Sequence, residues 1–180
     1  MSAAVPSEIT IRRAEITDAV QIARVHVDSW RAAYAGLMPD DVLASLSVER
    51  RAEGWRHLLA ARPPHCGLIA IRGSTAVGFA YVGPCRDEGC PADAGELMAI
   101  YVRPDAWGNG WGAVLHRAAL SGLSAAHFPV AVLWVLEANA RAHAFFARQG
   151  WSLDGARRGE EYRGTTLQVV RYQMRVPGSQ

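Results

Sequence analysis

Apolar residues recur along the chain at two spacings, one typical of strands and the other of helices. Short apolar or alternating runs, bounded by glycine, proline or polar residues, predict strands. These runs occupy residues 9–13, 68–72, 77–82, 96–102, 130–136, 151–155 and 167–176. Gly73-Ser74, between the second and third runs, predicts a hairpin. We therefore expect a sheet of about seven strands.

Apolar positions three or four residues apart predict helices between these strands. The stripe of the first helix comprises Ile16, Val20, Ala23, Val27, Trp30 and Tyr34. Further helices are expected at residues 40–45, 48–61, 111–123 and 139–149. Residues 84–94 predict a loop, and 158–164 a polar turn. With no repeat or linker, we expect one α/β domain over residues 8–176, a flexible tail at 1–7 and a short tail at 177–180.

Composition limits the function classes that this chain can belong to. Half of its 180 residues are apolar and the formal net charge is +2, which is typical of a globular protein and argues against a nucleic-acid binder. All 19 basic residues are arginine. The absence of lysine excludes a lysine Schiff base with pyridoxal phosphate, and it also excludes a P-loop of the GxxxxGK[ST] type.

Cysteine usage and hydropathy predict a cytoplasmic protein without a metal. Cys66, Cys85 and Cys90 are odd in number, which favours free thiols in a reducing compartment. Their spacing and the scattered histidines complete no zinc ligand set. No signal peptide is apparent, and no run approaches the ~20 apolar residues of a membrane span. We therefore expect no membrane association.

One segment, residues 96–112, carries the pattern of a phosphate-binding loop. A strand is followed by a proline turn and then by Gly108, Gly110 and Gly112 at the start of a helix. A helix start presents unpaired N–H groups and the positive end of the helix dipole, and glycine lets the backbone approach an anion. This arrangement favours a phosphate-bearing ligand. The alternative is a glycine-rich turn that serves only to make a tight connection between the strand and the helix.

A dinucleotide-binding loop is the weaker of two phosphate-binding interpretations. Gly108, Gly110 and Ala113 fit the GxGxxG/A fingerprint. Such a loop normally begins at the strand end, whereas residues 103–107 intervene here. The rest of the chain also offers too few βα units for a doubly wound fold.

The second interpretation rests on a resemblance to the GNAT superfamily, the Gcn5-related N-acetyltransferases. Ile100-Tyr101-Val102-Arg103-Pro104 followed by Trp107-Gly108-Asn109-Gly110-Trp111-Gly112 resembles the family's motif A. Residues 132–136 with Asn139, Ala142, Phe145-Phe146 and Gly150-Trp151 resemble its motif B. The resemblance extends from Ile9 to about Met174. It implies a single mixed-sheet domain with a splayed pair of parallel strands, and acetyl-CoA as cosubstrate.

The resemblance also assigns cofactor-binding roles. The backbone of Ile100, Tyr101 and Val102 would pair with the pantetheine arm in the gap between the splayed strands. The amides of the segment 108–113 would hold the pyrophosphate. Asn139 would bind the arm, and Phe146 would lie beside the thioester. Phe145 is expected either beside the ligand or in the core. The residues of the phosphate-binding segment are Gly108, Asn109, Gly110, Trp111, Gly112 and Ala113.

Two positions depart from the family pattern. Trp107 stands where the motif has glutamine or arginine, so this side chain supplies no polar group to the phosphate end. Phe146 stands where many members carry a tyrosine that is proposed to protonate the departing thiolate. Phenylalanine has no hydroxyl, so that catalytic role does not transfer to this chain.

The acceptor side is predicted from a few residues on the first helix and one strand. Trp30 and Tyr34 lie one turn apart and would form an aromatic wall for an apolar or cationic amine, although helix core is the alternative for both. Glu96 would deprotonate the acceptor ammonium directly or through water, or else be a solvated strand end. Glu137 is a second candidate base.

These residues lead us to expect an acetyl-CoA-dependent N-acetyltransferase. An amine would attack the thioester directly in a ternary complex, without an enzyme-bound intermediate. The acceptor is expected to be a small-molecule amine or a protein amine. Whether the chain forms a homodimer is left open. The alternative from another class is a non-catalytic acyl-CoA sensor, which the missing tyrosine favours.

Overall fold

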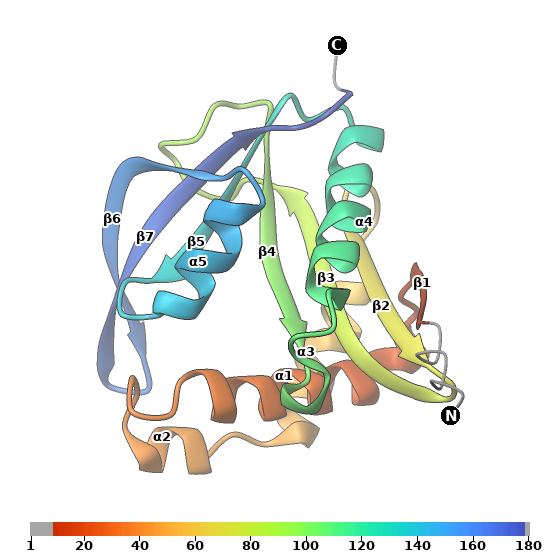
Figure 1. The fold of residues 1–180 in the computed structure, drawn as a ribbon, viewed down its shortest axis with the longest axis vertical. Coiled ribbons are helices and arrows are strands. Elements are labelled where there is room, and N and C mark those ends of the chain that lie inside the picture. Colours follow the sequence, from red (N-terminus) through yellow and green to blue (C-terminus); the bar gives the residue numbers. More distant parts are fainter. Residues whose placement is uncertain (1–8, 179–180) are drawn as a thin grey trace, which may run out of the picture.

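The computed structural model describes residues 9–178, in which three helices follow the first strand and strands predominate afterwards (Figure 1). The strands are β1 (Ile9–Arg13), β2 (Cys66–Arg72), β3 (Thr75–Pro84), β4 (Ala94–Val102), β5 (Val130–Leu136), β6 (Ser152–Tyr162) and β7 (Thr165–Arg175). The helices are α1 (Ala19–Ala33), α2 (Asp40–Ala44), α3 (Val48–Leu59), α4 (Trp111–Ala125) and α5 (Ala140–Arg148). Short 3₁₀ turns precede α1 and α4, at Ile16–Asp18 and Pro104–Ala106. The predicted tail at residues 1–7 lies outside the described residues.

The seven strands form one mixed sheet in the order β1-β2-β3-β4-β5-β7-β6, which confirms the predicted fold class. The parallel pair is β4 with β5, and the other neighbours are antiparallel. The parallel register covers only Ala94–Val130 to Glu96–Val132. Beyond it β4 keeps its pairing with β3, and β5 with β7, so the two parallel strands diverge.

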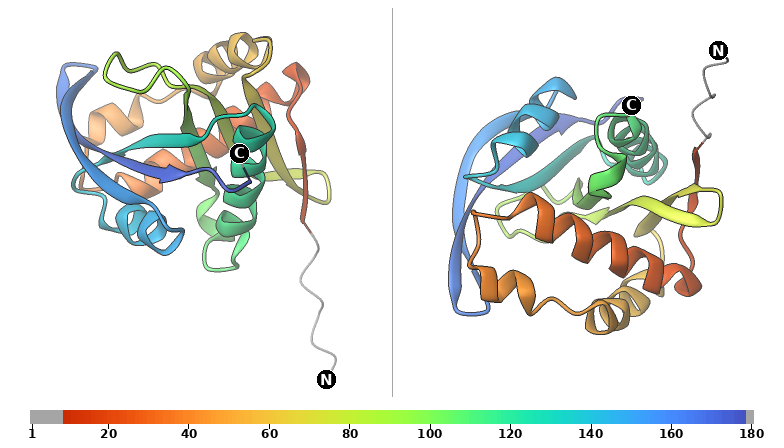
Figure 2. Two further views of the ribbon diagram at one scale, coloured as in Figure 1. Left: turned by 90° about the horizontal axis from the view of Figure 1, so that it is seen from above. Right: turned by 60° about the horizontal axis from the view of Figure 1, so that its bottom comes forward.

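Helices cover both faces of the sheet. Apolar residues of α4, together with Phe146 of α5, pack against β3, β4 and β5. Residues of α1 and α3, among them Ile22 and Trp55, pack against the opposite face around Phe79. The right view of Figure 2 shows α1, α2 and α3 below the sheet and α4 and α5 above it. The divergence of β4 and β5 therefore lies between two helical layers.

The C-terminal hairpin corrects the predicted turn. β6 continues through most of the polar segment 158–164, and the chain reverses only at Arg163 and Gly164. Both turn residues have positive φ, 49° and 79°, as a two-residue hairpin turn of this kind requires. Alternate charged residues of β6 form ion pairs on one face of the strand, so high polarity here did not indicate a loop.

The expectation of three free cysteines was also wrong. Cys85 and Cys90 are joined in a disulfide, while Cys66 is free. Both bonded cysteines belong to the loop between β3 and β4, which brings them together over five residues of sequence. In the described part of the chain, no helix is long and apolar enough to cross a membrane.

Candidate acyl-CoA site

A cavity of about 780 Å³ occupies the divergence of β4 and β5. Residues 97–102 of β4 and 133–136 of β5 line it, together with the start of α4, one side of α5 and the end of α1. Because β5 has moved away, the backbone groups of this part of β4 that point toward it have no strand partner there. An extended ligand with amide groups could therefore add to β4 as a strand would.

The phosphate-binding pattern of the sequence lies at one end of this cavity. Gly110 is the N-cap of α4, with φ 78°, and Gly108 has φ 79°. A Cβ at either position would meet nothing within 4 Å, so the loop surface is open. The first N–H groups of α4 have no partner within the helix, and its first turn contains no acidic residue. Electrostatics and shape both favour an anion here.

Arg141 of α5 brings a charged group beside Trp107 in the cavity lining. The guanidinium of Arg141 lies 3.1 Å from the centre of the Trp107 ring, and both residues line the cavity. The Trp107 indole is itself fixed, because Nε1 donates to the carbonyl of Val102 at 2.6 Å. Burial lowers the pKa of Arg141, but a guanidinium remains charged. The sequence analysis missed Arg141, since 34 positions separate it from Trp107.

We expect Arg141→Ala to weaken acetyl-CoA binding by about five- to tenfold, the effect of losing one charge-assisted contact. Arg141→Lys should retain part of the affinity, because it keeps the charge but loses the planar stack on Trp107. Calorimetry over a series of salt concentrations is the measurement. Equal affinities for the three proteins at low salt would remove Arg141 from the site.

Most of the remaining predicted cofactor residues line the cavity, whereas Asn109 does not. Asn139 lines the cavity and caps α5, because its side-chain oxygen accepts from the amide of Ala142 at 3.1 Å and leaves the amide nitrogen as a donor. Phe146 also lines the cavity, but it is only 7% exposed and packs into the core. Asn109 is not among the described residues that line the cavity, and its side chain bonds to the carbonyls of Ala106 and Trp107 instead. Ile100, Tyr101, Val102, Trp111, Gly112 and Ala113 all line it.

Tyrosine side chains form part of the cavity lining. Tyr34 of α1 and Tyr101 of β4 line it. Burial raises the pKa of Tyr34 well above its ordinary value, and the charge and hydrogen bond of Tyr101 add to this effect. Burial likewise raises the pKa of Tyr101. Both phenols are therefore neutral at physiological pH, and a hydrogen bond joins them.

Trp30 lies behind Tyr34 and is not among the described residues that line the cavity. Its ring meets Tyr34 edge-on, with centroids 5.0 Å apart. The guanidinium of Arg51 lies over the Trp30 ring at 4.9 Å and donates to the hydroxyl of Tyr162 at 2.7 Å. A side chain of the protein thus occupies the aromatic face that was expected to receive a cationic amine.

The two candidate bases are both engaged in ion pairs. Glu96 is 3% exposed, and its oxygens accept from Nε and Nη2 of Arg86 at 3.1 and 2.9 Å. Glu137 pairs with Arg157 at 2.9 Å. Among residues 9–178, those that line the cavity include no aspartate or glutamate. The structure therefore does not bring either predicted base to the cavity wall.

The β3–β4 loop contains a group of three potential metal-ligating residues. Ligand atoms of Cys85, Asp87 and Cys90 lie within 4.8 Å of one another. The two sulfurs are joined to each other, and Asp87 is paired with Arg158 and Arg171. A covalent bond between two ligands and two guanidinium groups at the third make this group unsuited to a cation.

The divergent parallel strands, with a glycine-rich helix start in the cavity lining, form a site on an α/β sheet that suits an elongated phosphate-bearing ligand. Comparison with known proteins agrees. Residues 25–151 match the acetyltransferase (GNAT) family. The chain is 35% identical over 132 residues to YuaI of Bacillus subtilis, an uncharacterised N-acetyltransferase, covering 73% of each protein. The chain therefore belongs to the acetyltransferase (GNAT) family.

Solved structures share this fold over nearly their whole length. The PaiA N-acetyltransferase of Thermoplasma acidophilum, in complex with coenzyme A, has a TM-score of 0.73 at 20% identity, covering 93% of this chain and 99% of that one. YncA of Salmonella typhimurium, a putative acetyltransferase with its cofactor acetyl-CoA, has a TM-score of 0.68 at 19% identity, covering 94% and 95%.

Proposed function

We propose that this protein transfers the acetyl group of acetyl-CoA to an amine by direct attack in a ternary complex. The observation that carries the proposal is the continuity of the cavity. One cavity is lined by the start of α4, by Arg141, by the part of β4 that has no partner strand, and by the neutral phenols of Tyr34 and Tyr101. The helix start suits the phosphates, and the phenols suit an uncharged nucleophile. Coenzyme complexes of structural neighbours support the same cofactor.

The chemistry requires little from the protein beyond placement. The amine lone pair attacks the thioester carbonyl carbon, the C–S bond breaks, and the ammonium proton is lost. A thiol has a pKa near ~8.5, so the thiolate is a fair leaving group without an acid at Phe146. The backbone of β4 would hold the pantetheine amides, and the phenols of Tyr34 and Tyr101 would lie beside the acceptor amine.

The ion pair of Glu96 with Arg86 favours a structural role for this carboxylate over the predicted role of base. Because Arg86 holds the carboxylate away from the cavity lining, a proton must reach it through water. From the ion pair we expect Glu96→Gln to lower the denaturation midpoint, with a loss of kcat/KM that is similar at every pH. Glu137→Gln is the control, since its pair is half exposed. A loss of ~10²-fold or more at neutral pH that recovers at high pH would instead establish Glu96 as the base.

A non-catalytic acyl-CoA sensor is the competing function, and the lack of a carboxylate in the described cavity lining favours it. An acceptor panel with acetyl-CoA separates the two functions. The panel includes spermidine, tyramine, an aminoglycoside, phosphinothricin and a peptide with N-terminal alanine, and release of free thiol is measured. Turnover of any of these amines supports the enzyme. Tight acetyl-CoA binding with no turnover supports the sensor.

A further inference from the structure

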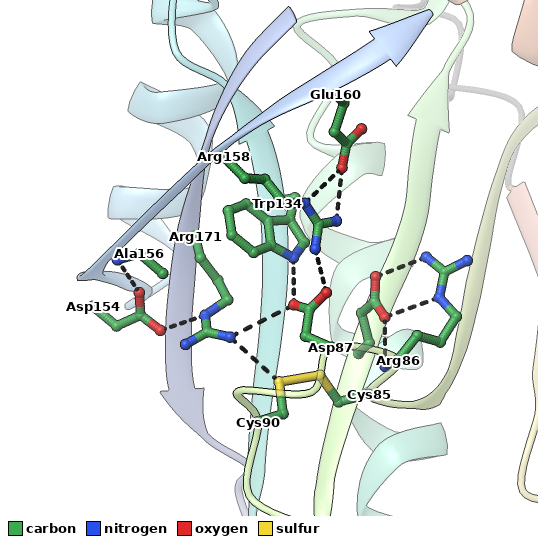
Figure 3. A network of polar contacts seen from close by, with 11 residues as sticks. Cys85, Arg86, Asp87, Cys90, Trp134, Asp154, Ala156, Arg158, Glu160 and Arg171 are labelled. Atoms are coloured by element: carbon green, nitrogen blue, oxygen red, sulfur yellow. Dashed lines mark hydrogen bonds and ion pairs between the residues drawn. A yellow bond between two sulfur atoms is a disulfide. The ribbon is translucent and has the colours of Figure 1, made fainter.

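We infer that the disulfide-closed loop of residues 85–90 positions Trp134 in the wall of the cavity, on the sheet face that carries Tyr101, with Asp87 as the positioning residue. The consequence for the acceptor rests on the proposed function. The placement of the indole itself does not, since it follows from contacts within the described residues (Figure 3).

The carboxylate of Asp87 is mostly shielded from solvent and contacts several polar side chains. Its Oδ2 accepts from the indole Nε1 of Trp134 at 2.7 Å, and its Oδ1 accepts from Arg158. Arg171 lies 3.6 Å from the same carboxylate, whose side chain is 13% exposed. Although burial opposes it, these hydrogen bonds lower the pKa of Asp87. The carboxylate is therefore ionised at neutral pH, and each of its contacts is charge-assisted.

Trp134 connects this network to the cavity. It lies on β5, where side chains alternate between the faces of the sheet. Leu133 and Val135 point into the core beneath α4 and α5, so Trp134 points to the opposite face, on which Tyr101 also lies. Trp134 lines the cavity, and the guanidinium of Arg158 covers its ring at 4.0 Å. Asp87 holds the edge of the indole and Arg158 holds one face, so the loop fixes this part of the cavity wall.

The disulfide limits how far Asp87 can move. Cys85 and Cys90 close a ring around it, and the amide of Cys85 bonds to the carbonyl of Ala94 at 2.9 Å. Arg86 ties the same loop to β4 through Glu96. Arg171 contacts the sulfur of Cys90 at 3.5 Å as well as the Asp87 carboxylate. Breaking the disulfide would therefore loosen both Asp87 and Arg158, the two side chains that hold the indole of Trp134.

A dithiol reductant can open this ring by thiol–disulfide exchange. One thiolate of dithiothreitol attacks a cysteine sulfur and breaks the protein S–S bond, and its second thiolate then resolves the mixed disulfide. Cys85 and Cys90 each gain a proton and together gain two electrons, while the dithiol becomes a cyclic disulfide. The carboxylate of Asp87 then keeps its hydrogen bonds and ion pairs, but no covalent bond closes its loop.

The first test compares Asp87→Ala with Glu88→Ala, which removes a charge from the exposed neighbouring position of the same loop. We expect Asp87→Ala to raise KM for the fastest amine of the panel by about tenfold, with acetyl-CoA affinity unchanged within about twofold. Asp87→Asn, which keeps an oxygen for the indole, should lie between the two. Glu88→Ala should match the wild type. Equal behaviour of Asp87→Ala and Glu88→Ala, or an equal loss of acetyl-CoA affinity, overturns the inference.

The second test does not depend on enzymatic activity. The indole N–H resonance of Trp134 is assigned by its loss in Trp134→Phe, and is then followed in wild-type protein as dithiothreitol is added. We expect it to shift and broaden, and we expect the Cys85→Ser/Cys90→Ser double variant to show the loosened signal throughout. Cys66 is present in both proteins, so its reactions cancel. If neither reduction nor Asp87→Ala changes the indole N–H resonance of Trp134, the inference is overturned, even if no amine is acetylated.

The two tests also separate this inference from the proposed function. Acetylated product is measured by chromatography, because dithiothreitol would obscure a thiol assay. Failure of the whole panel with an indole signal that responds as expected rejects the acetyltransferase and retains the positioning role. Turnover that changes neither with Asp87→Ala nor on reduction rejects the positioning role and retains the acetyltransferase.

Discussion

Replacing Gly110 by glutamate is expected to weaken acetyl-CoA binding by well over tenfold, or more than ~1.4 kcal/mol. Gly110 caps α4 with φ 78°, at the point where the helix presents its free amides. The added carboxylate would repel the phosphates, and it would also take the amides itself, because an acidic group is favoured at a helix start. Calorimetry on folded protein measures the loss.

Gly110→Ala is the matched control for this substitution. It carries the same backbone strain of a side chain at positive φ, which costs on the order of 1 kcal/mol, but it adds no charge. A Cβ here meets nothing within 4 Å, so alanine should reduce acetyl-CoA affinity only slightly. If the glutamate variant is folded and binds as well as the wild type, the cofactor lies elsewhere.

Truncation of Phe146 to alanine is expected to lower the free energy of unfolding by about 3–5 kcal/mol, as for other buried phenylalanines. The ring is 7% exposed and meets Phe145, Trp151 and Tyr172 at centroid distances of 5.2, 6.1 and 6.3 Å. Its loss leaves a cavity that these rings cannot fill without moving. Denaturant unfolding, with the slope checked for two-state behaviour, measures the effect.

Two further variants show whether Phe146 also has a role at the thioester. Phe146→Leu keeps an apolar filler, so it should cost less than about 1.5 kcal/mol and leave kcat nearly unchanged. Phe146→Tyr adds a hydroxyl at a residue that lines the cavity. A large gain in kcat with a new alkaline limb would show that the site lacks an acid. A stability loss for Phe146→Ala no larger than that for the half-buried Phe145→Ala would contradict the core role.

The cofactor half of the site was largely predictable because its signals are local. The glycines at 108–112, the proline turn before them and the strand before that turn are contiguous, and the helix start they form presents backbone amides. Such a site needs no particular side chain from elsewhere. Asn139 as a helix cap and Gly150 after the last turn are likewise properties of a few neighbouring residues. Element order and the family resemblance followed from the same local patterns.

The acceptor half was less predictable because it is made of side chains from distant segments. Arg51 covers Trp30 from another helix, and Arg86 holds Glu96 from a neighbouring loop. Sequence patterns report how a residue prefers to fold, whereas they do not report which charged group will arrive beside it. An aromatic wall and a free carboxylate were reasonable expectations for isolated residues, and each was altered by a partner.

Hydrophobic period and backbone conformation are encoded within a few residues, so the α/β domain, the order of its elements and the helix start that favours phosphate could be predicted from the sequence alone. The length of the β6–β7 hairpin, the Cys85–Cys90 bond and the pairing of Arg141 with Trp107 became apparent only in the folded chain. The hairpin depends on pairing across strands, the disulfide on the path of the loop between β3 and β4, and the Arg141–Trp107 contact on residues 34 positions apart. The packing of the sheet sets these contacts, so they could not be read before the fold was known.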